Sequence, residues 1–322
     1  LQAVGGTVGA PSLVITKGVI AADNPNATIP PAAPSDPSAV LADSDVSDVD
    51  AFDEITFVVT VENVGTTPAY NVTIDDPATA GFACAEPVLG DIENGDGTTL
   101  SFTGDLATGI VLDDPLAEND GTEGAPFAND TALLTLRCNL DASVEPLQAY
   151  TNEAGVTWTS VPDPSAPFTR VADTAVATVI APRISKVVTD ITPGYSTAVR
   201  EAHVGELVTY QVTVEIPEGV SSNARLEDRL PNGFAMVEVV SLTPSSPDLS
   251  TSEGSLADVL ANVGFNNLCG GEAAPARRFV IGPGNNDSGF GTITNTNTDN
   301  STVETITIVY RVRVLNASVN TN

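Results

Sequence analysis

The sequence predicts an all-β protein of the sandwich type. Three segments alternate β-branched or aromatic residues with other residues at a period of two, as half-buried strands do: residues 55–62, 208–215 and 305–314. Clusters of Gly, Pro, Asn and Asp separate such segments, as turns require. Helical periodicity is scarce, and only residues 255–263 are expected to form a short helix. Short strands joined by turns favour two packed sheets.

Length and composition predict the number of domains and exclude some classes of binding partner. At about 150 residues per domain, the 322 residues predict two domains. The chain carries 12 basic and 42 acidic residues, a net charge of −30, and its only lysines are Lys17 and Lys186. This charge argues against nucleic acid as a partner, because phosphates need basic contacts. No transmembrane segment is expected, because no run approaches about 18 apolar residues.

The sequence contains an internal repeat. Residues 57–62 match residues 210–215, and the segments that follow place Asp76 opposite Asp228. Upstream of both matches, the only two lysines also fall at corresponding positions. The chain is therefore expected to contain two copies of one sandwich unit.

The ends of the repeat define the predicted domains. Residues 178–182 precede the second lysine as residues 7–11 precede the first. We therefore expect residues 12–182 to form the first repeat and residues 183–322 a second repeat that lacks its last strand. Residues 1–11 are expected to end a preceding unit or to act as a donor strand. The residues predicted for strand donation are Thr7, Val8, Gly9, Ala10 and Pro11.

The second repeat carries a family pattern. An Ile-x-Lys step at 184–186, Val-Gly followed by Val-Thr-Tyr-x-Val-Thr-Val at 204–214, and Asp-x-Leu-Pro-x-Gly-Phe at 228–234 resemble the conserved repeat domains of large prokaryotic cell-surface proteins. These are immunoglobulin-like domains related to the isopeptide-forming domains of pili and adhesins. The resemblance implies two tandem immunoglobulin-like β-sandwich domains and an extracellular location at the cell surface.

The resemblance also implies a self-made cross-link. In some relatives a first-strand lysine attacks a last-strand asparagine, while a buried carboxylic acid shuttles protons. The candidate residues here are Lys17, Asp76 and Asn152 in the first repeat, and Lys186, Asp228 and Asn320 in the second. Burial would supply a neutral amine and a protonated acid. The alternative is that each lysine packs its stem beneath an exposed ammonium group.

The cysteines have two interpretations. Similar repeats bridge a cysteine pair near these positions, so the resemblance implies a Cys84–Cys138 disulfide formed in an oxidising compartment. Two buried free thiols are the alternative. Cys269 has no evident mate in the sequence.

Acidic residues concentrate before the strand at 55–62, at the spacing of loop calcium sites. The candidate metal ligands are Asp43, Asp45, Asp48, Asp50, Asp53 and Glu54. Calcium is the only cofactor that the sequence suggests. The alternative is a solvated acidic loop that maintains solubility.

Signs of enzymatic chemistry are lacking. The sequence has a single histidine, His203, and no Gly-x-Ser-x-Gly motif, so a Ser-His-Asp triad finds no support. A zinc site of the His/Cys kind lacks ligands, and no Gly-rich phosphate loop joins a strand to a helix. We expect no enzyme beyond a single-turnover self-crosslink.

The leading functional hypothesis is an extracellular structural protein that builds a cell-surface fibre, filament or layer. Its partners would be copies of itself or neighbouring repeats, joined head to tail by strand donation. The alternative is an adhesin that binds a surface glycan or protein through the insertion at residues 21–50, since loops on a rigid scaffold often carry function. A proline-stiffened surface loop would explain the same insertion.

Overall fold

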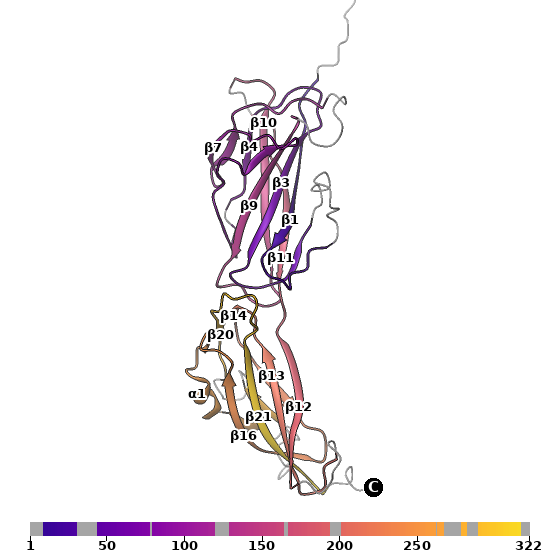
Figure 1. The fold of residues 1–322 in the computed structure, drawn as a ribbon, viewed down its shortest axis with the longest axis vertical. Helices are drawn as coiled ribbons and strands as arrows, with labels where there is room; N and C mark the ends of the chain where they lie inside the picture. Colours follow the sequence, from indigo (N-terminus) through magenta and orange to yellow (C-terminus); the bar gives the residue numbers. More distant parts are fainter. Residues whose placement is uncertain are drawn as a thin grey trace, which may run out of the picture. The chain divides into compact units, whose positions relative to one another are not determined.

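The computed structural model describes residues 9–30, 44–77, 79–119, 129–163, 167–193, 201–261, 263–266, 278–281 and 289–316. This part of the chain is all-β apart from one short helix, α1 (Leu256–Ala261) (Figure 1). The predicted fold class is therefore confirmed as all-β. The described residues contain no helix that is long and apolar enough to cross a membrane.

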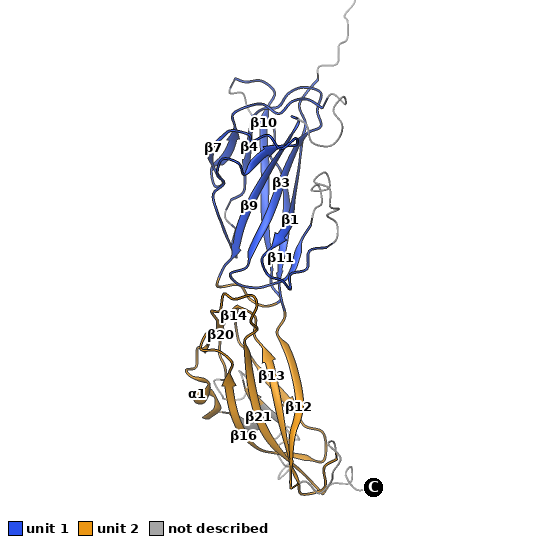
Figure 2. Ribbon diagram, viewed as in Figure 1, with its two compact units in different colours: residues 1–141, 147–180 blue, residues 142–146, 181–322 orange. Residues whose placement is uncertain are grey.

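The chain divides into two compact units (Figure 2). Unit 1 comprises residues 1–141 and 147–180, and unit 2 comprises residues 142–146 and 181–322. Residues 142–146, placed by the sequence in the first repeat, thus belong to unit 2, where the Val220 N–H donates to the carbonyl of Val144 at 3.0 Å.

Two sheets build unit 1. The first is antiparallel and contains β1 (Leu13–Ala22), β3 (Glu54–Asn63), β9 (Thr131–Leu140) and β5 (Phe82–Cys84) in that order, with β6 (Ile92–Asn94) also paired to β9. The second has the order β2 (Val46–Val49), β11 (Val171–Val179), β10 (Ala149–Thr159), β4 (Tyr70–Asp75), β8 (Gly109–Leu112) and β7 (Phe102–Asp105). Strands β10 and β11 pack across the core against β1.

Unit 2 repeats the first sheet. Its main sheet has the order β12 (Arg183–Thr192), β13 (Leu207–Glu215), β21 (Thr305–Val314) and β16 (Phe234–Pro244). Two three-stranded sheets accompany it: β14 (Gly219–Ser221), β20 (Ile293–Asn295) and β17 (Leu249–Thr251), and β15 (Leu226–Arg229), β19 (Arg278–Ile281) and β18 (Gly264–Asn266). The predicted strands at 55–62, 208–215 and 305–314 are thus β3, β13 and β21.

The backbone repeats in detail. The β1–β3 register shifts just after Val19, and the β12–β13 register shifts just after Val188, the residue two beyond each lysine. The turns after β4 and β15 also agree, because Gly81 and Gly233 both have positive φ values, 92° and 94°. Glycine adopts this conformation without steric cost. The repeat found in the sequence is therefore a repeat of structure.

The units differ in what covers the first strand. In unit 1, β11 and β10 lie across β1. In the described residues of unit 2, no strand occupies the corresponding place over β12, and nine of its ten residues are exposed.

Candidate functional site

A lysine occupies a core position of unit 1. Leu13, Ile15, Lys17 and Val19 are the alternate residues of β1 that face the core, and Lys17 is fully buried. Its Nζ atom hydrogen-bonds Oδ2 of Asp76, which is also buried. The same Nζ atom lies 5.2 Å from the centroid of the Phe57 ring, a cation–π distance. An amine and a carboxyl group are therefore paired inside an apolar core.

Burial changes the acid–base character of this pair. It lowers the pKa of the Lys17 amine and raises the pKa of the Asp76 carboxyl, and the opposite charge of each partner counteracts these shifts. Asp76 follows β4, where its N–H donates to the carbonyl of Leu106 at 3.2 Å. Its Oδ1 atom is buried and accepts no hydrogen bond of normal geometry. Burial thus acts against the charged form of each group, which lowers the cost of a neutral amine and a protonated carboxyl group here.

The predicted asparagine completes the group. Asn152 lies on β10 in the opposite sheet and is 1% exposed. Its side chain acts on the Asp76 carboxyl, whose pKa it lowers, and its Nδ2 atom lies 3.9 Å from Sγ of Cys138. Cys138 is joined to Cys84 by a disulfide between β9 and β5. The structure therefore brings together Lys17, Asp76 and Asn152 beside the disulfide.

A second carboxylate, which the sequence did not predict, contacts Lys17. Oδ2 of Asp173, on β11, accepts a hydrogen bond of 2.7 Å from the backbone N–H of Lys17. It also raises the pKa of the Lys17 side chain through its charge. No local pattern could have identified Asp173, because the contact depends on β11 lying across β1.

The corresponding group of unit 2 is open to solvent. Lys186 Nζ lies 2.6 Å from Asp228 Oδ2, but the lysine side chain is 36% exposed. The ammonium lies 4.4 Å from the centroid of the Tyr210 ring and 5.5 Å from that of Tyr310. The predicted third member, Asn320, lies outside the described residues.

A tyrosine pair distinguishes unit 2 from unit 1. Tyr210 pairs with Tyr310 across β13 and β21, whereas Phe57 pairs with Leu136 across β3 and β9. The Tyr310 hydroxyl donates to Oδ2 of Asp228, and burial raises the pKa of both tyrosines. The carboxylate of unit 2 therefore receives a second donor that the unit 1 strands do not supply.

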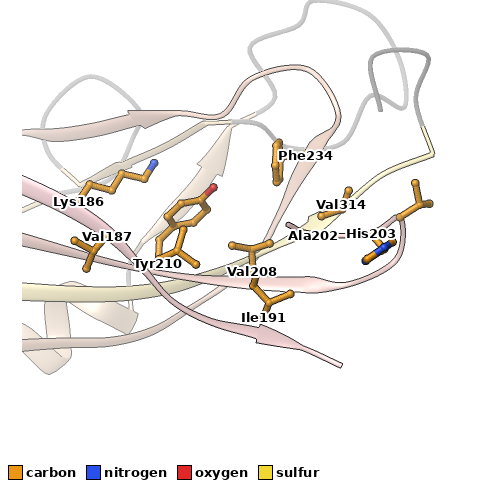
Figure 3. A pocket seen from close by; sticks show the side chains of 11 residues that line it. Lys186, Val187, Ile191, Ala202, His203, Val208, Tyr210, Phe234 and Val314 are labelled. Atoms are coloured by element: carbon orange, nitrogen blue, oxygen red, sulfur yellow. The ribbon is translucent and has the colours of Figure 1, made fainter. Parts of the chain in front are cut away.

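A pocket of about 970 Å³ adjoins Lys186 (Figure 3). Lys186 and Tyr210 lie at one end, His203 and Val314 at the other, and Val208 lies between them. Most of the lining residues are apolar, and Lys186, His203 and Tyr210 add polar groups.

The predicted calcium ligands separate into different contacts. Asp45 Oδ1 accepts from the Val176 N–H at 2.8 Å, and Asp48 Oδ2 accepts from the Ser47 hydroxyl at 3.2 Å. The N–H of Glu54 donates to Asp23 Oδ1. Asp43 lies outside the described residues.

Two of the predicted ligands do meet, through an asparagine. Asn24 Nδ2 donates to Asp53 Oδ2 at 2.9 Å and to Asp50 Oδ1 at 3.3 Å. Burial raises the pKa of Asp53 to about 7, and the charges of Asp50 and Asp23 act in the same direction. Within the described ranges, no three His, Cys, Asp or Glu residues are grouped to hold a metal ion. Calcium binding by this loop stays a prediction.

The predicted donor strand is partly described. The Thr66 N–H donates to the carbonyl of Ala10 at 3.2 Å, Pro11 is buried, and Gly9 lies beside Thr66. These residues contact unit 1 of their own chain. Thr7 and Val8 lie outside the described residues.

Comparisons with known proteins give distant likenesses of fold. No protein-family model and no curated protein matches the sequence. Among solved structures, the chain is similar to the C-terminal domain of the antigen I/II polypeptide BspA of Streptococcus agalactiae, with 10% identity, a TM-score of 0.31, and coverage of 94% of this chain and 92% of that one.

Two pilins are also similar. The major pilin subunit BcpA of Bacillus cereus has 9% identity and a TM-score of 0.31, with 66% of this chain and 61% of that chain covered. The full-length major pilin SpaD of Corynebacterium diphtheriae has 14% identity and a TM-score of 0.25, with 77% and 52% covered. Similarities this low carry no argument about function.

Proposed function

We propose that this chain is an extracellular structural unit of a cell-surface fibre, filament or layer, and that a Lys17–Asn152 isopeptide bond closes its first sandwich. The observation that carries the proposal is the burial of Lys17, Asp76 and Asn152 together between the two sheets of unit 1. A buried amine–carboxyl pair costs desolvation energy in either protonation state, so a chain without a use for it would be as stable with apolar residues there.

The chemistry needs no added reagent. The neutral amine of Lys17 attacks Cγ of Asn152, the new C–N bond forms, and the Cγ–Nδ2 bond breaks. Asp76 passes the proton released by Nζ to the departing nitrogen, which leaves as ammonia. The sheets hold the amine and amide in proximity, which supplies most of the rate. Each molecule reacts once, so this is self-crosslinking and not enzymatic turnover.

The product would suit a protein under tension. Lys17 is on β1 and Asn152 is on β10, so the bond would tie the two sheets of unit 1 covalently. The Cys84–Cys138 disulfide ties β5 to β9 in the first of these sheets. Disulfides persist in oxidising surroundings, which supports an extracellular location.

The exposed β12 face of unit 2 supports head-to-tail assembly through strand addition, because an open sandwich otherwise invites aggregation. The adhesin hypothesis draws no support from the described residues of the 21–50 insertion.

Intact mass of the folded chain tests the cross-link. The expected result is the loss of one ammonia per molecule relative to the sequence mass, and no loss in a Lys17→Arg variant. A folded wild-type chain at its full sequence mass would contradict the proposed bond.

A further inference from the structure

The strand β12 exposes the face that its counterpart β1 buries. Ile15 is 8% exposed and Val19 0%, whereas the corresponding Ile184 is 63% exposed and Val188 43% exposed. In unit 1 this face is covered by β11 and β10. Apolar residues at matching inward positions indicate a surface that requires a cover, since such contiguous patches usually mark interaction sites.

We propose that the open face of unit 2 binds residues 1–8 of a second copy of this chain, in the position that β11 occupies in unit 1. This inference rests on the proposed structural role, because it identifies the partner that continues the assembly. The pocket beside Lys186 is the part of this face that the strand would fill (Figure 3).

The sequence of the segment fits this position. Aligning residues 7–11 with residues 178–182 places Val4, Gly6 and Val8 where Ala175, Ala177 and Val179 stand. These three residues of β11 are its buried, inward-facing positions. Small apolar residues at the same alternate positions would present one apolar face to β12.

The same alignment supplies a polar contact. It places Gln2 where Asp173 stands, and Asp173 accepts the backbone N–H of Lys17 at 2.7 Å. The side-chain oxygen of Gln2 can accept the N–H of Lys186 in the same way, because an amide oxygen is also an acceptor. The alignment therefore also supplies a counterpart to Asp173, whose side chain accepts the backbone N–H of Lys17.

Charge favours this segment over others in the chain. Residues 1–8 contain no charged side chain, whereas the whole chain has a net charge of −30. Two copies repel each other at long range, so a neutral segment docking beside the Lys186 ammonium meets the least repulsion. Salt should strengthen the association, since it screens the repulsion but not apolar burial.

In the copy that supplies residues 1–8, the residues that follow them lead directly into unit 1. Gly9–Pro11 contact unit 1 of their own chain, and Leu13 begins β1 immediately after them. In the middle of the chain, residues 178–182 link β11 to β12 with a matching sequence. One copy would thus follow another through the link that joins the two units of a single copy.

Sedimentation of the full chain over a range of concentration and salt tests this inference. The wild-type chain should form multimers whose size increases with protein concentration and with salt concentration. A chain lacking residues 1–8 and a Val188→Asp variant should both stay monomeric. Val188 is exposed, so its substitution leaves the monomer folded, as circular dichroism would verify. The matched control is Val240→Asp, an exposed valine of β16 outside the pocket, which should associate like wild type.

A labelled peptide with the sequence of residues 1–11 gives a second readout. It should bind the chain lacking residues 1–8 and lose at least tenfold in affinity for the Val188→Asp form of that chain. A wild-type chain that stays monomeric throughout, or a shortened chain that assembles like wild type, would overturn the inference. Intact mass of the same samples reports the Lys17–Asn152 bond separately, so either proposal can fail alone.

Discussion

The Nζ atom of Lys17 hydrogen-bonds Oδ2 of Asp76 in the core of unit 1, and neither side chain reaches solvent. The matching pair of unit 2, Lys186 and Asp228, is partly exposed. One repeated pattern thus gives a buried Lys–Asp pair in one unit and a partly exposed pair in the other. In the part of the chain that the structure describes, β10 and β11 cover β1, whereas no strand covers β12.

The two lysines should contribute unequally to stability. A Lys17→Met substitution removes the partner of the buried Asp76 and also the proposed bond to Asn152, so unit 1 should lose at least about 3–5 kcal/mol of unfolding free energy. Trp158, the only tryptophan, is buried in β10, so its fluorescence during denaturation with urea reports unit 1. Lys186→Met should cost unit 2 below about 1 kcal/mol, because the pair is partly exposed and solvent-screened, and amide hydrogen exchange in β13 and β21 measures this loss. Similar losses for both variants would contradict the account.

Asp76 should be required for the cross-link, not only for folding. An Asp76→Asn variant keeps the size of the side chain but cannot shuttle the proton, so it should retain the full sequence mass. Asp228→Asn should show the same mass loss as wild type. Ammonia loss in a folded Asp76→Asn chain would assign the proton transfer to another group.

Asp53 should make stability fall as pH rises. Its folded pKa of about 7 exceeds the ordinary value of 3.8, so the folded state binds more protons between these pH values. The cost at pH 7 is on the order of 3 kcal/mol relative to pH 4. An Asp53→Asn variant, which mimics the protonated form, should gain stability over wild type as pH rises from 4 to 7. Urea unfolding at several pH values measures this difference, and a constant difference would refute it.

The disulfide should stabilise unit 1 selectively. Removing the Cys84–Cys138 bond by a Cys84→Ala, Cys138→Ala double substitution should cost about 2–4 kcal/mol. Amide hydrogen exchange should accelerate in β5 and β9 and stay unchanged in β13 and β21. Equal acceleration in both units would contradict a local role.

The sequence predicted the long strands and the pairing of a lysine with an aspartate. Alternation located β3, β13 and β21, and the resemblance to cell-surface repeat domains indicated the Lys17–Asp76 pair. Other contacts between distant segments were not predictable, because local patterns do not specify which strands and loops meet. Asp173 reaches the Lys17 backbone in this way, and Asn24 joins Asp50 to Asp53.

Tyr310 of unit 2 occupies the position that Leu136 occupies in unit 1. This correspondence could be recognised only once the strand pairing was known. Tyr310 pairs with Tyr210 and bonds Asp228, a contact that depends on the β13–β21 register. Residues 142–146 join unit 2 for a similar reason, since their partners lie far along the chain.

The most direct test of the central claim is peptide mapping of the folded, full-length chain by tandem mass spectrometry. The account predicts a branched peptide that joins Lys17 to Asn152 with loss of one ammonia. Separate, linear peptides containing an unmodified Lys17 and an unmodified Asn152 would contradict it.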